Sequence, residues 1–226
     1  MVETHENSEV LDMLNVSYHY PNRKGVNGIS IKVMKGELTL LVGRTGSGKT
    51  TMYKLIAREL VPDSGEITLM NLKSSKLKGR EFAVWRRHLG IVFQDLRLLT
   101  DRNVLENVRL AAECETRLPT SAKARALRVL NRVGMAHKMK DSPSELSTGE
   151  QQRVAIARAL VNEPLVLLAD EPVSNLDAET SSEIIEILNQ VSLFGTAVLV
   201  ATHQPERFEK YNPRIMRMDN GTLLAS

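Results

Sequence analysis

A glycine-rich segment that ends in Lys-Thr is the first candidate for chemistry in this sequence. Residues 43–50 read GRTGSGKT and match the pattern G-x-x-x-x-G-K-[ST] at every fixed position. The segment follows an apolar, strand-like stretch at 38–42 and opens a helix-period stretch at 50–60. Backbone N–H groups in such a turn and the N-terminus of the following helix both stabilise anions. The segment therefore predicts a phosphate-binding loop; the competing interpretation is a glycine-rich turn with a solvated lysine.

The side chains of this loop suggest individual contacts with a nucleotide. We expect Lys49 to reach the β- and γ-phosphates and the Thr50 hydroxyl to ligate Mg²⁺. Thr51 is placed to bond the α-phosphate. The three loop glycines let the backbone turn inward without a Cβ clash.

Two adjacent carboxylates follow a second apolar stretch. Residues 165–169 read LVLLA and are followed directly by Asp170 and Glu171. Taken alone, this pair is as consistent with a solvated turn or a helix cap as with a site. Beside a phosphate-binding loop, Asp170 is expected to hold Mg²⁺ and Glu171 to polarise an attacking water as a general base.

A third segment, 146–160, predicts a helix whose N-terminus is available to an anion. Ser147 is a good N-cap residue, and Gly149 permits close backbone approach. Taken alone, the segment would be an ordinary capped surface helix. Taken in this order with the two preceding elements, it closely resembles the ATP-binding subunits of ABC transporters, and the resemblance runs from about Val10 to Leu224.

The resemblance implies an ATPase in which two subunits pair head to tail, with each ATP between one phosphate loop and the other subunit's signature segment. It implies catalytic roles for Lys49, Gln94, Glu171 and His203. It implies Mg²⁺ ligation by Thr50, Gln94 and Asp170. It implies nucleotide contacts from Tyr20 (with Tyr18 as the alternative for stacking on adenine), Gly43, Arg44, Thr45, Gly46, Ser47, Gly48, Lys49, Thr50 and Thr51. It implies contacts from the second subunit by Ser147, Thr148, Gly149, Glu150 and Asp177.

Two segments depart from the family pattern. The signature segment reads LSTGE at 146–150, with Thr148 where a second glycine is common. A β-branched residue there is expected to restrict the backbone and weaken contact with the γ-phosphate. Val173 and Ser174 stand where Thr and Gly are usual. Neither change removes a charged catalytic group, so we expect activity, with slow turnover as one outcome.

The segment 91–108 discriminates between branches of the family. Its Phe-Gln-Asp, leucine pair, Asp-Arg and Glu-Asn-Val resemble the cell-division branch, whose ATPase signals through an integral membrane partner to cell-wall hydrolases. Residues 94–113 are expected to form the docking region for that partner. The alternatives are the ATPase of a lipoprotein-release or macrolide-type exporter, and a nucleotide-binding scaffold with little hydrolysis.

Composition limits the remaining function classes. The 226 residues carry a net charge of +3, a balance that argues against a nucleic-acid coat. The single cysteine, Cys114, excludes a disulfide framework and a zinc site built from cysteines. No apolar run approaches the roughly 18 residues of a membrane span, and residues 1–10 lack the features of a signal peptide. We expect a protein on the cytoplasmic side of the bacterial inner membrane, attached through its partner.

The pattern of elements predicts an α/β fold of the P-loop type with a mixed sheet. Continuous apolar runs at 38–42, 89–93, 165–169 and 197–201 indicate central parallel strands. Stretches 10–20 and 28–37 are expected to be antiparallel strands, and 213–226 a hairpin turning at 219–221. Helices are predicted at 104–112, 121–133 and 149–160. We expect a single domain over 1–226, with an α/β core formed by 1–93 and 163–226 and an inserted helical subdomain at 94–162.

Overall fold

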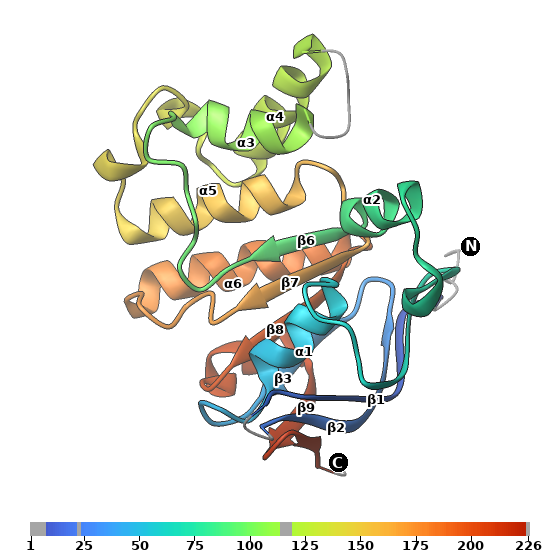
Figure 1. The fold of residues 1–226 in the computed structure, drawn as a ribbon. Coiled ribbons are helices and arrows are strands. Elements are labelled where there is room, and N and C mark those ends of the chain that lie inside the picture. Colours follow the sequence, from blue (N-terminus) through green and yellow to red (C-terminus); the bar gives the residue numbers. More distant parts are fainter. Residues whose placement is uncertain (1–7, 22–23, 114–118, 225–226) are drawn as a thin grey trace, which may run out of the picture.

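The computed structural model describes residues 8–21, 24–113 and 119–224, so Cys114 lies outside the described residues. A six-stranded sheet forms the centre of the molecule (Figure 1), in the order β10-β9-β3-β8-β7-β6. Strands β3, β6, β7, β8 and β9 run parallel, whereas β10 pairs antiparallel with β9. The bounds are β3 Leu38–Val42, β6 Leu89–Val92, β7 Val166–Asp170, β8 Ala197–Thr202, β9 Arg214–Asp219 and β10 Thr222–Leu223. The predicted parallel strands and the C-terminal hairpin are confirmed.

A second, four-stranded antiparallel sheet has the order β2-β1-β4-β5. Its strands are β1 Glu9–His19, β2 Gly25–Met34, β4 Ser64–Leu69 and β5 Leu72–Lys73. The antiparallel pairing of the first two was predicted. The last two were missed, because they are short and place only a few apolar residues on one face.

Alternate residues of each central strand point to opposite faces of the sheet, and each face has its own core. On β7, Leu167 and Ala169 pack with the helical part of the molecule, whereas Val166 and Leu168 pack toward the antiparallel sheet. Both sets are fully buried, which explains the uninterrupted apolar run at 165–169.

Six α-helices surround the two sheets within the described residues. They are α1 Lys49–Ile56, α2 Arg80–Arg87, α3 Val104–Glu113, α4 Pro119–Arg132, α5 Thr148–Leu160 and α6 Ala178–Leu193. Short 3-10 segments are η1 Ser74–Lys76, η2 Ala136–Lys138, η3 Pro143–Glu145 and η4 Pro205–Tyr211. In Figure 1, α3 and α4 lie above α5, and α1 lies near the antiparallel sheet. The helices predicted at 104–112, 121–133 and 149–160 are confirmed, and α2 and α6 were not predicted.

The helix after the phosphate loop is shorter than predicted. The helix was predicted over 50–60, but it ends at Ile56, about one turn earlier. Beyond it Arg58 has a positive φ of 57°, so the chain leaves the helical conformation. The carbonyl of Ile56 instead accepts a hydrogen bond from the indole N–H of Trp85, at 2.8 Å. This contact ties α2 to the end of α1.

None of the helices in the described ranges combines the length and the apolar character that crossing a bilayer requires.

Candidate functional site

The phosphate loop connects the end of β3 to the start of α1. Gly48 caps α1 with φ of 110°, a conformation that strains any residue with a Cβ. A Cβ on Gly43 would lie 2.4 Å from the Met218 carbonyl oxygen and 2.5 Å from Ser47 Oγ. The two glycines are therefore required for different reasons, a backbone conformation at one and a close approach at the other.

Lys49 is buried within its own loop. Its ammonium group donates to the carbonyl oxygen of Gly43 at 2.5 Å and to that of Arg44 at 3.4 Å. These bonds hold the Lys49 ammonium group against the backbone at the start of the phosphate loop.

The end of β7 brings an acid to the first turn of α1. Thr50 Oγ1 donates to Asp170 Oδ2 at 3.3 Å, although the two residues are 120 positions apart. Burial raises the pKa of Asp170. The hydrogen bond from Thr50 lowers this pKa, and the neighbouring charge of Glu171 raises it. The hydroxyl and the carboxylate thus place two oxygen atoms side by side next to the phosphate loop.

Glu171 and His203 form the second polar pair. His203 Nδ1 lies 2.9 Å from Glu171 Oε2, and the Glu171 backbone N–H donates to the carbonyl of Ala201. Glu171 has a φ of 47°, an unusual conformation for a residue with a side chain, of the kind that clusters at functional sites. The strained backbone aims a nearly buried carboxylate, 12% exposed, at the more open imidazole.

These groups line one cavity of about 440 Å³, which we call the phosphate cavity. Its lining residues are Tyr20, Lys24, Gly25, Thr45, Gly46, Gly48, Lys49, Thr50, Thr51, Gln94, Asp170, Glu171 and His203. The expected nucleotide-binding residues Gly43, Arg44 and Ser47 do not line it, and the Ser47 side chain is buried. Tyr20 lines the cavity and Tyr18 does not, although the two rings pack edge to face at 5.0 Å. Lys24 and Gly25 were not expected, and no motif marked them.

The signature segment does not reach the phosphate cavity of its own chain. Ser147, Gly149 and Glu150 line a different hollow of about 460 Å³, beside Thr180 of α6. Ser147 caps α5 as predicted, and Ser147 and Glu150 form a reciprocal capping box. Lys138 lies 2.9 Å from Glu150, and this hydrogen bond, with that from the Ser147 backbone, lowers the Glu150 pKa.

Gly149 and Thr148 are explained by packing and backbone conformation. A Cβ on Gly149 would lie 2.3 Å from Cγ2 of Thr180, so glycine allows α5 to approach α6. Thr148 begins the helix and has no positive φ. A β-branched residue adopts this helical backbone at little cost, so the expected backbone restriction at Thr148 is not observed.

Asp177 does not line this hollow; it is the N-cap of α6, the helix that carries Thr180. Its carboxylate accepts from the backbone N–H of Thr180 at 2.9 Å and from the Thr180 hydroxyl at 2.7 Å. The hydroxyl bond lowers the pKa of Asp177 most, followed by the backbone bond. In this chain Asp177 is therefore a helix cap, exposed beside the signature segment.

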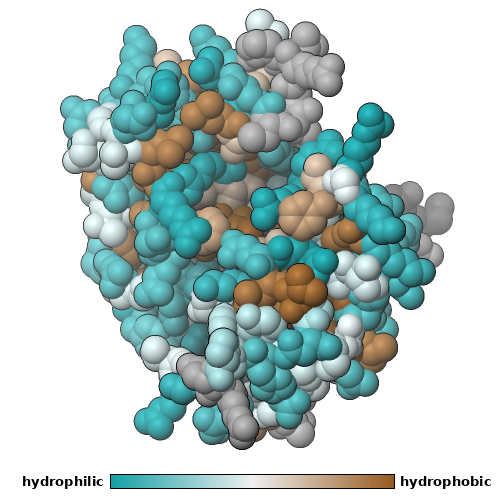
Figure 2. Space-filling model, viewed as in Figure 1, coloured by the Kyte–Doolittle hydropathy of each residue, from teal (hydrophilic) through white to brown (hydrophobic). Residues whose placement is uncertain are grey.

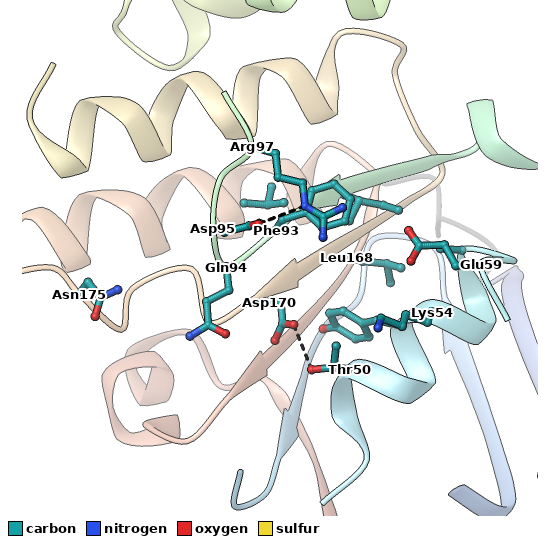
Figure 3. Close-up of a pocket in the computed structure, with 14 residues that line it drawn as sticks. Thr50, Lys54, Glu59, Phe93, Gln94, Asp95, Arg97, Leu168, Asp170 and Asn175 are labelled. Atoms are coloured by element: carbon teal, nitrogen blue, oxygen red, sulfur yellow. Dashed lines mark hydrogen bonds and ion pairs between the residues drawn. The ribbon is translucent and has the colours of Figure 1, made fainter. Parts of the chain in front are cut away.

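A second cavity of about 490 Å³, which we call the groove, adjoins the phosphate cavity (Figure 3). The two share Thr50, Gln94 and Asp170. The rest of the groove is lined by Tyr53, Lys54, Ala57, Glu59, Ile91, Val92, Phe93, Asp95, Arg97, Leu168 and Asn175. Figure 2 shows apolar patches along the middle of this face, within a mostly hydrophilic surface. The α1 wall and Asn175 escaped sequence reasoning, because only the fold brings α1 beside residues 91–97.

Arg158 of α5 holds the loop that follows Gln94. Its guanidinium donates to the carbonyl oxygens of Leu96 and Arg97, each at 2.5 Å. Both acceptors have positive φ, 54° and 49°, so this turn has a backbone that the local sequence disfavours. One partly buried side chain thus joins the signature helix to the loop that carries Gln94.

Replacing Arg158 with Gln is expected to destabilise the chain by about 2–3 kcal/mol, because two carbonyls lose a charged donor. Urea unfolding followed by the fluorescence of Trp85, the single tryptophan, measures the change. Arg128→Gln is the control: its exposed pair with Glu163 is expected to contribute less than about 1 kcal/mol. Equal destabilisation by the two changes would contradict the role given to Arg158.

Comparisons with known proteins agree with this geometry. The ABC transporter family matches residues 26–174. The cell division ATP-binding protein FtsE of Bacillus subtilis is 40% identical over 216 residues, which cover 95% of each chain. FtsE of Mycobacterium tuberculosis is 41% identical over 214 residues, covering 95% of this chain and 93% of the relative.

Solved structures agree at the level of the fold. The ABC transporter component cbiO1 of Clostridium perfringens superposes with a TM-score of 0.88 and 29% identity, covering 97% of this chain and 88% of that one. A dimeric bacterial ABC transporter cassette, MJ0796, superposes with a TM-score of 0.84 and 31% identity, covering 95% and 97%. The chain therefore belongs to the ABC transporter family, as an ATP-hydrolysing subunit most like the cell-division protein FtsE.

Proposed function

We propose that two copies of this chain hydrolyse ATP in composite sites and drive an FtsX-like permease, which regulates cell-wall hydrolases. The observation that carries the composite site is the separation of the phosphate cavity from the signature segment. The phosphate cavity contains Lys49 and Glu171, whereas Ser147 and Gly149 open on another hollow of the same chain. A head-to-tail pair would place the signature segment of one copy over the phosphate cavity of the other. MJ0796, 31% identical, is described as a dimeric cassette.

The residues of the phosphate cavity fit in-line attack of water on the γ-phosphorus. Glu171 would accept the water proton as the new O–P bond forms and the bond to ADP breaks. His203, 2.9 Å away, would orient the Glu171 carboxylate and approach the γ-phosphate. Lys49 would balance the charge of the β- and γ-phosphates. Tyr20 would stack on the adenine.

The oxygen ligands beside the loop fit Mg²⁺. Thr50 Oγ1 and Asp170 Oδ2 are 3.3 Å apart, and Gln94 lines the same cavity with an amide oxygen. Hydroxyl, carboxylate and amide oxygens are ligands for a hard cation, which also keeps waters and phosphate oxygens in its shell. When bound, Mg²⁺ would neutralise charge on the transferred phosphoryl group.

The groove is the proposed docking site for a helix of the permease. Of residues 94–113, expected from sequence to contact the partner, Gln94, Asp95 and Arg97 line one side of it, and α1 lines the other through Tyr53 and Lys54. Because Gln94 lines both cavities, nucleotide binding and partner docking would act on one side chain. We propose accordingly that the chain is a single ABC domain, with the core at 1–93 and 163–226 and the coupling segment within 94–162. It would lie on the cytoplasmic side of the bacterial inner membrane.

Mixing two inactive variants tests the composite site. Lys49→Ala damages only the phosphate loop. Thr148→Asp places an acid in the first turn of α5, which favours the helix but repels a partner's nucleotide. We expect each alone to turn over ATP at less than about 1% of the wild-type rate. An equal mixture should recover about a quarter of it, because half the dimers are mixed and each contains one intact site.

A signature segment that acted within its own chain would leave the mixture as inactive as either variant. That outcome, at a concentration where the wild type forms dimers, would contradict the composite site. The partner is tested separately by co-purification with an FtsX-like permease and with a lipoprotein-release permease. Binding to the second alone would remove the cell-division part of the proposal.

A further inference from the structure

Positive charge is concentrated in one short segment, residues 73–87. It contains Lys73, Lys76, Lys78, Arg80, Arg86 and Arg87 against one acid, Glu81, a net charge of +5. The whole chain carries +3, so the other residues together carry −2. The overall charge balance therefore conceals a local basic cluster, which we call the basic segment.

The basic side chains are available to a partner. Lys73, Lys76, Lys78, Arg80 and Arg86 are exposed. In the part of the chain that the structure describes, none of the six basic residues forms an ion pair. Arg86 lies 4.7 Å from the centre of the Phe82 ring, which leaves its charge uncompensated.

The two acids that form hydrogen bonds within this segment, Glu66 and Glu81, bond to neutral groups. The Glu66 carboxylate accepts from the hydroxyls of Ser74 and Ser75 and from the Ser75 backbone N–H. Glu81 accepts from the backbone N–H of Lys78 at 3.2 Å. These contacts use neutral donors, so they fix the shape of the segment without pairing its cations.

The segment has a fixed position beside the groove. The fully buried Trp85 holds α2 against the end of α1. Ser74, near the start of the basic segment, is also buried. The indole contact is at Ile56, next to Ala57 of the groove wall. Figure 1 shows α2 beside the start of β6, at the edge of the molecule. If a membrane permease docks in the groove, as we propose above, the basic segment lies close to that membrane.

We propose that the basic segment binds the anionic phospholipid headgroups of the membrane beside the permease. None of its six cations lines the cavities described above, so the arrangement suits an extended charged surface better than a small ligand. Clusters of four to eight Lys and Arg bind anionic lipid, with a gain for each residue near the surface. The long stems of lysine and arginine also let the charges spread over such a surface. This proposal rests on the proposed function only for its statement of which face meets the membrane.

Vesicle co-sedimentation of the full chain, without a permease, tests the proposal. The probes are vesicles of phosphatidylcholine alone and with about one third phosphatidylglycerol. We expect binding only to the second, weakening as salt is raised because the Debye length falls. Replacing Lys73, Lys76, Lys78 and Arg80 with Gln should weaken the affinity for anionic vesicles by about 100-fold or more, because each charge contributes a factor of about five. Arginine in place of the three lysines should preserve it.

The matched control removes the same charges elsewhere. Lys35, Lys123, Lys140 and Arg132 are exposed, and replacing them with Gln gives the same net charge of −1. We expect this variant to bind vesicles within about threefold of wild type, since distant charges are screened. Trp85 fluorescence verifies that all variants are folded, and their ATP turnover should match wild type.

Three results would overturn the proposal. Equal binding to both kinds of vesicle would show no preference for anionic lipid, and equal loss in the two glutamine variants would show an effect of net charge alone. If a DNA duplex displaced the protein from the vesicles at a lower concentration than added phosphatidylglycerol vesicles did, the segment would be a nucleic-acid surface. The mixing experiment above uses no membrane, so the composite site can stand or fail independently of these results.

Discussion

Replacing Glu171 with Gln is expected to lower ATP turnover by at least about 100-fold while ATP binding is retained. Glutamine has nearly the same shape but cannot accept a proton from water at neutral pH. Its amide can still bond His203, which lies 2.9 Å from the carboxylate in the wild type. Phosphate release measures turnover, and light scattering with ATP and Mg²⁺ measures mass. Because hydrolysis would be blocked after the composite site closes, the variant should remain a dimer with ATP, whereas the wild type returns to monomer.

Glu206→Gln is the control for this change. Glu206 is an exposed acid three positions after His203, outside the phosphate cavity. The substitution removes the same charge, and turnover should remain within about twofold of wild type because exposed charges are well screened. Turnover by Glu171→Gln at a similar level would contradict the role of Glu171 as general base. A dimer in neither protein, despite tight ATP binding, would favour the interpretation as a scaffold that needs its membrane partner to close.

Replacing Trp85 with Ala is expected to reduce the free energy of unfolding by about 3–5 kcal/mol. The indole is fully buried between α2 and the end of α1, and it supplies the hydrogen bond that the Ile56 carbonyl lacks where the helix ends. Alanine would leave a large cavity and an unpaired carbonyl. Urea unfolding followed by far-ultraviolet circular dichroism measures the loss, because the variant has no tryptophan to report by fluorescence.

Trp85→Phe separates the two contributions. It fills much of the cavity but leaves the Ile56 carbonyl without its donor, so we expect a smaller loss of about 1–3 kcal/mol. Phe194→Ala is the control for loss of a large aromatic ring, since Phe194 is 78% exposed and should contribute less than about 0.5 kcal/mol. A loss from Trp85→Ala no larger than from Phe194→Ala would contradict the anchoring of α2 on α1.

Several parts of the site could be predicted because their information is local. The phosphate loop requires glycines at set positions between a strand and a helix, and these features lie within 38–56. The apolar run at 165–169 identified a strand buried on both faces and placed Asp170 at its end. Helical periodicity at 121–133 and the Ser147 cap predicted α4 and α5 for the same reason.

Other features could not be predicted, because they join segments far apart in the chain. Periodicity shows that a strand is buried but not which strand lies beside it. It therefore could not show that Arg158 holds the carbonyls of Leu96 and Arg97, and the meeting of Thr50 with Asp170 was implied by the family resemblance and not by periodicity. Gly149 illustrates the limit: the sequence indicated close approach, and only the packing of α5 on α6 identified Thr180 as the neighbour.

Local residue patterns therefore predicted the elements of the site: a phosphate-binding loop, an acid pair after a strand, and a capped helix that follows the signature pattern. Residue patterns alone did not give their spatial relation; the family resemblance implied it, and the packing of the whole chain produces it. Burial of both faces of the central sheet brings Lys49, Asp170, Glu171 and His203 into one cavity. The same packing of α5 on α6 holds Ser147 and Gly149 at another hollow. Local propensity acts within a few residues, whereas the position of each element depends on the apolar surface that the whole chain must bury.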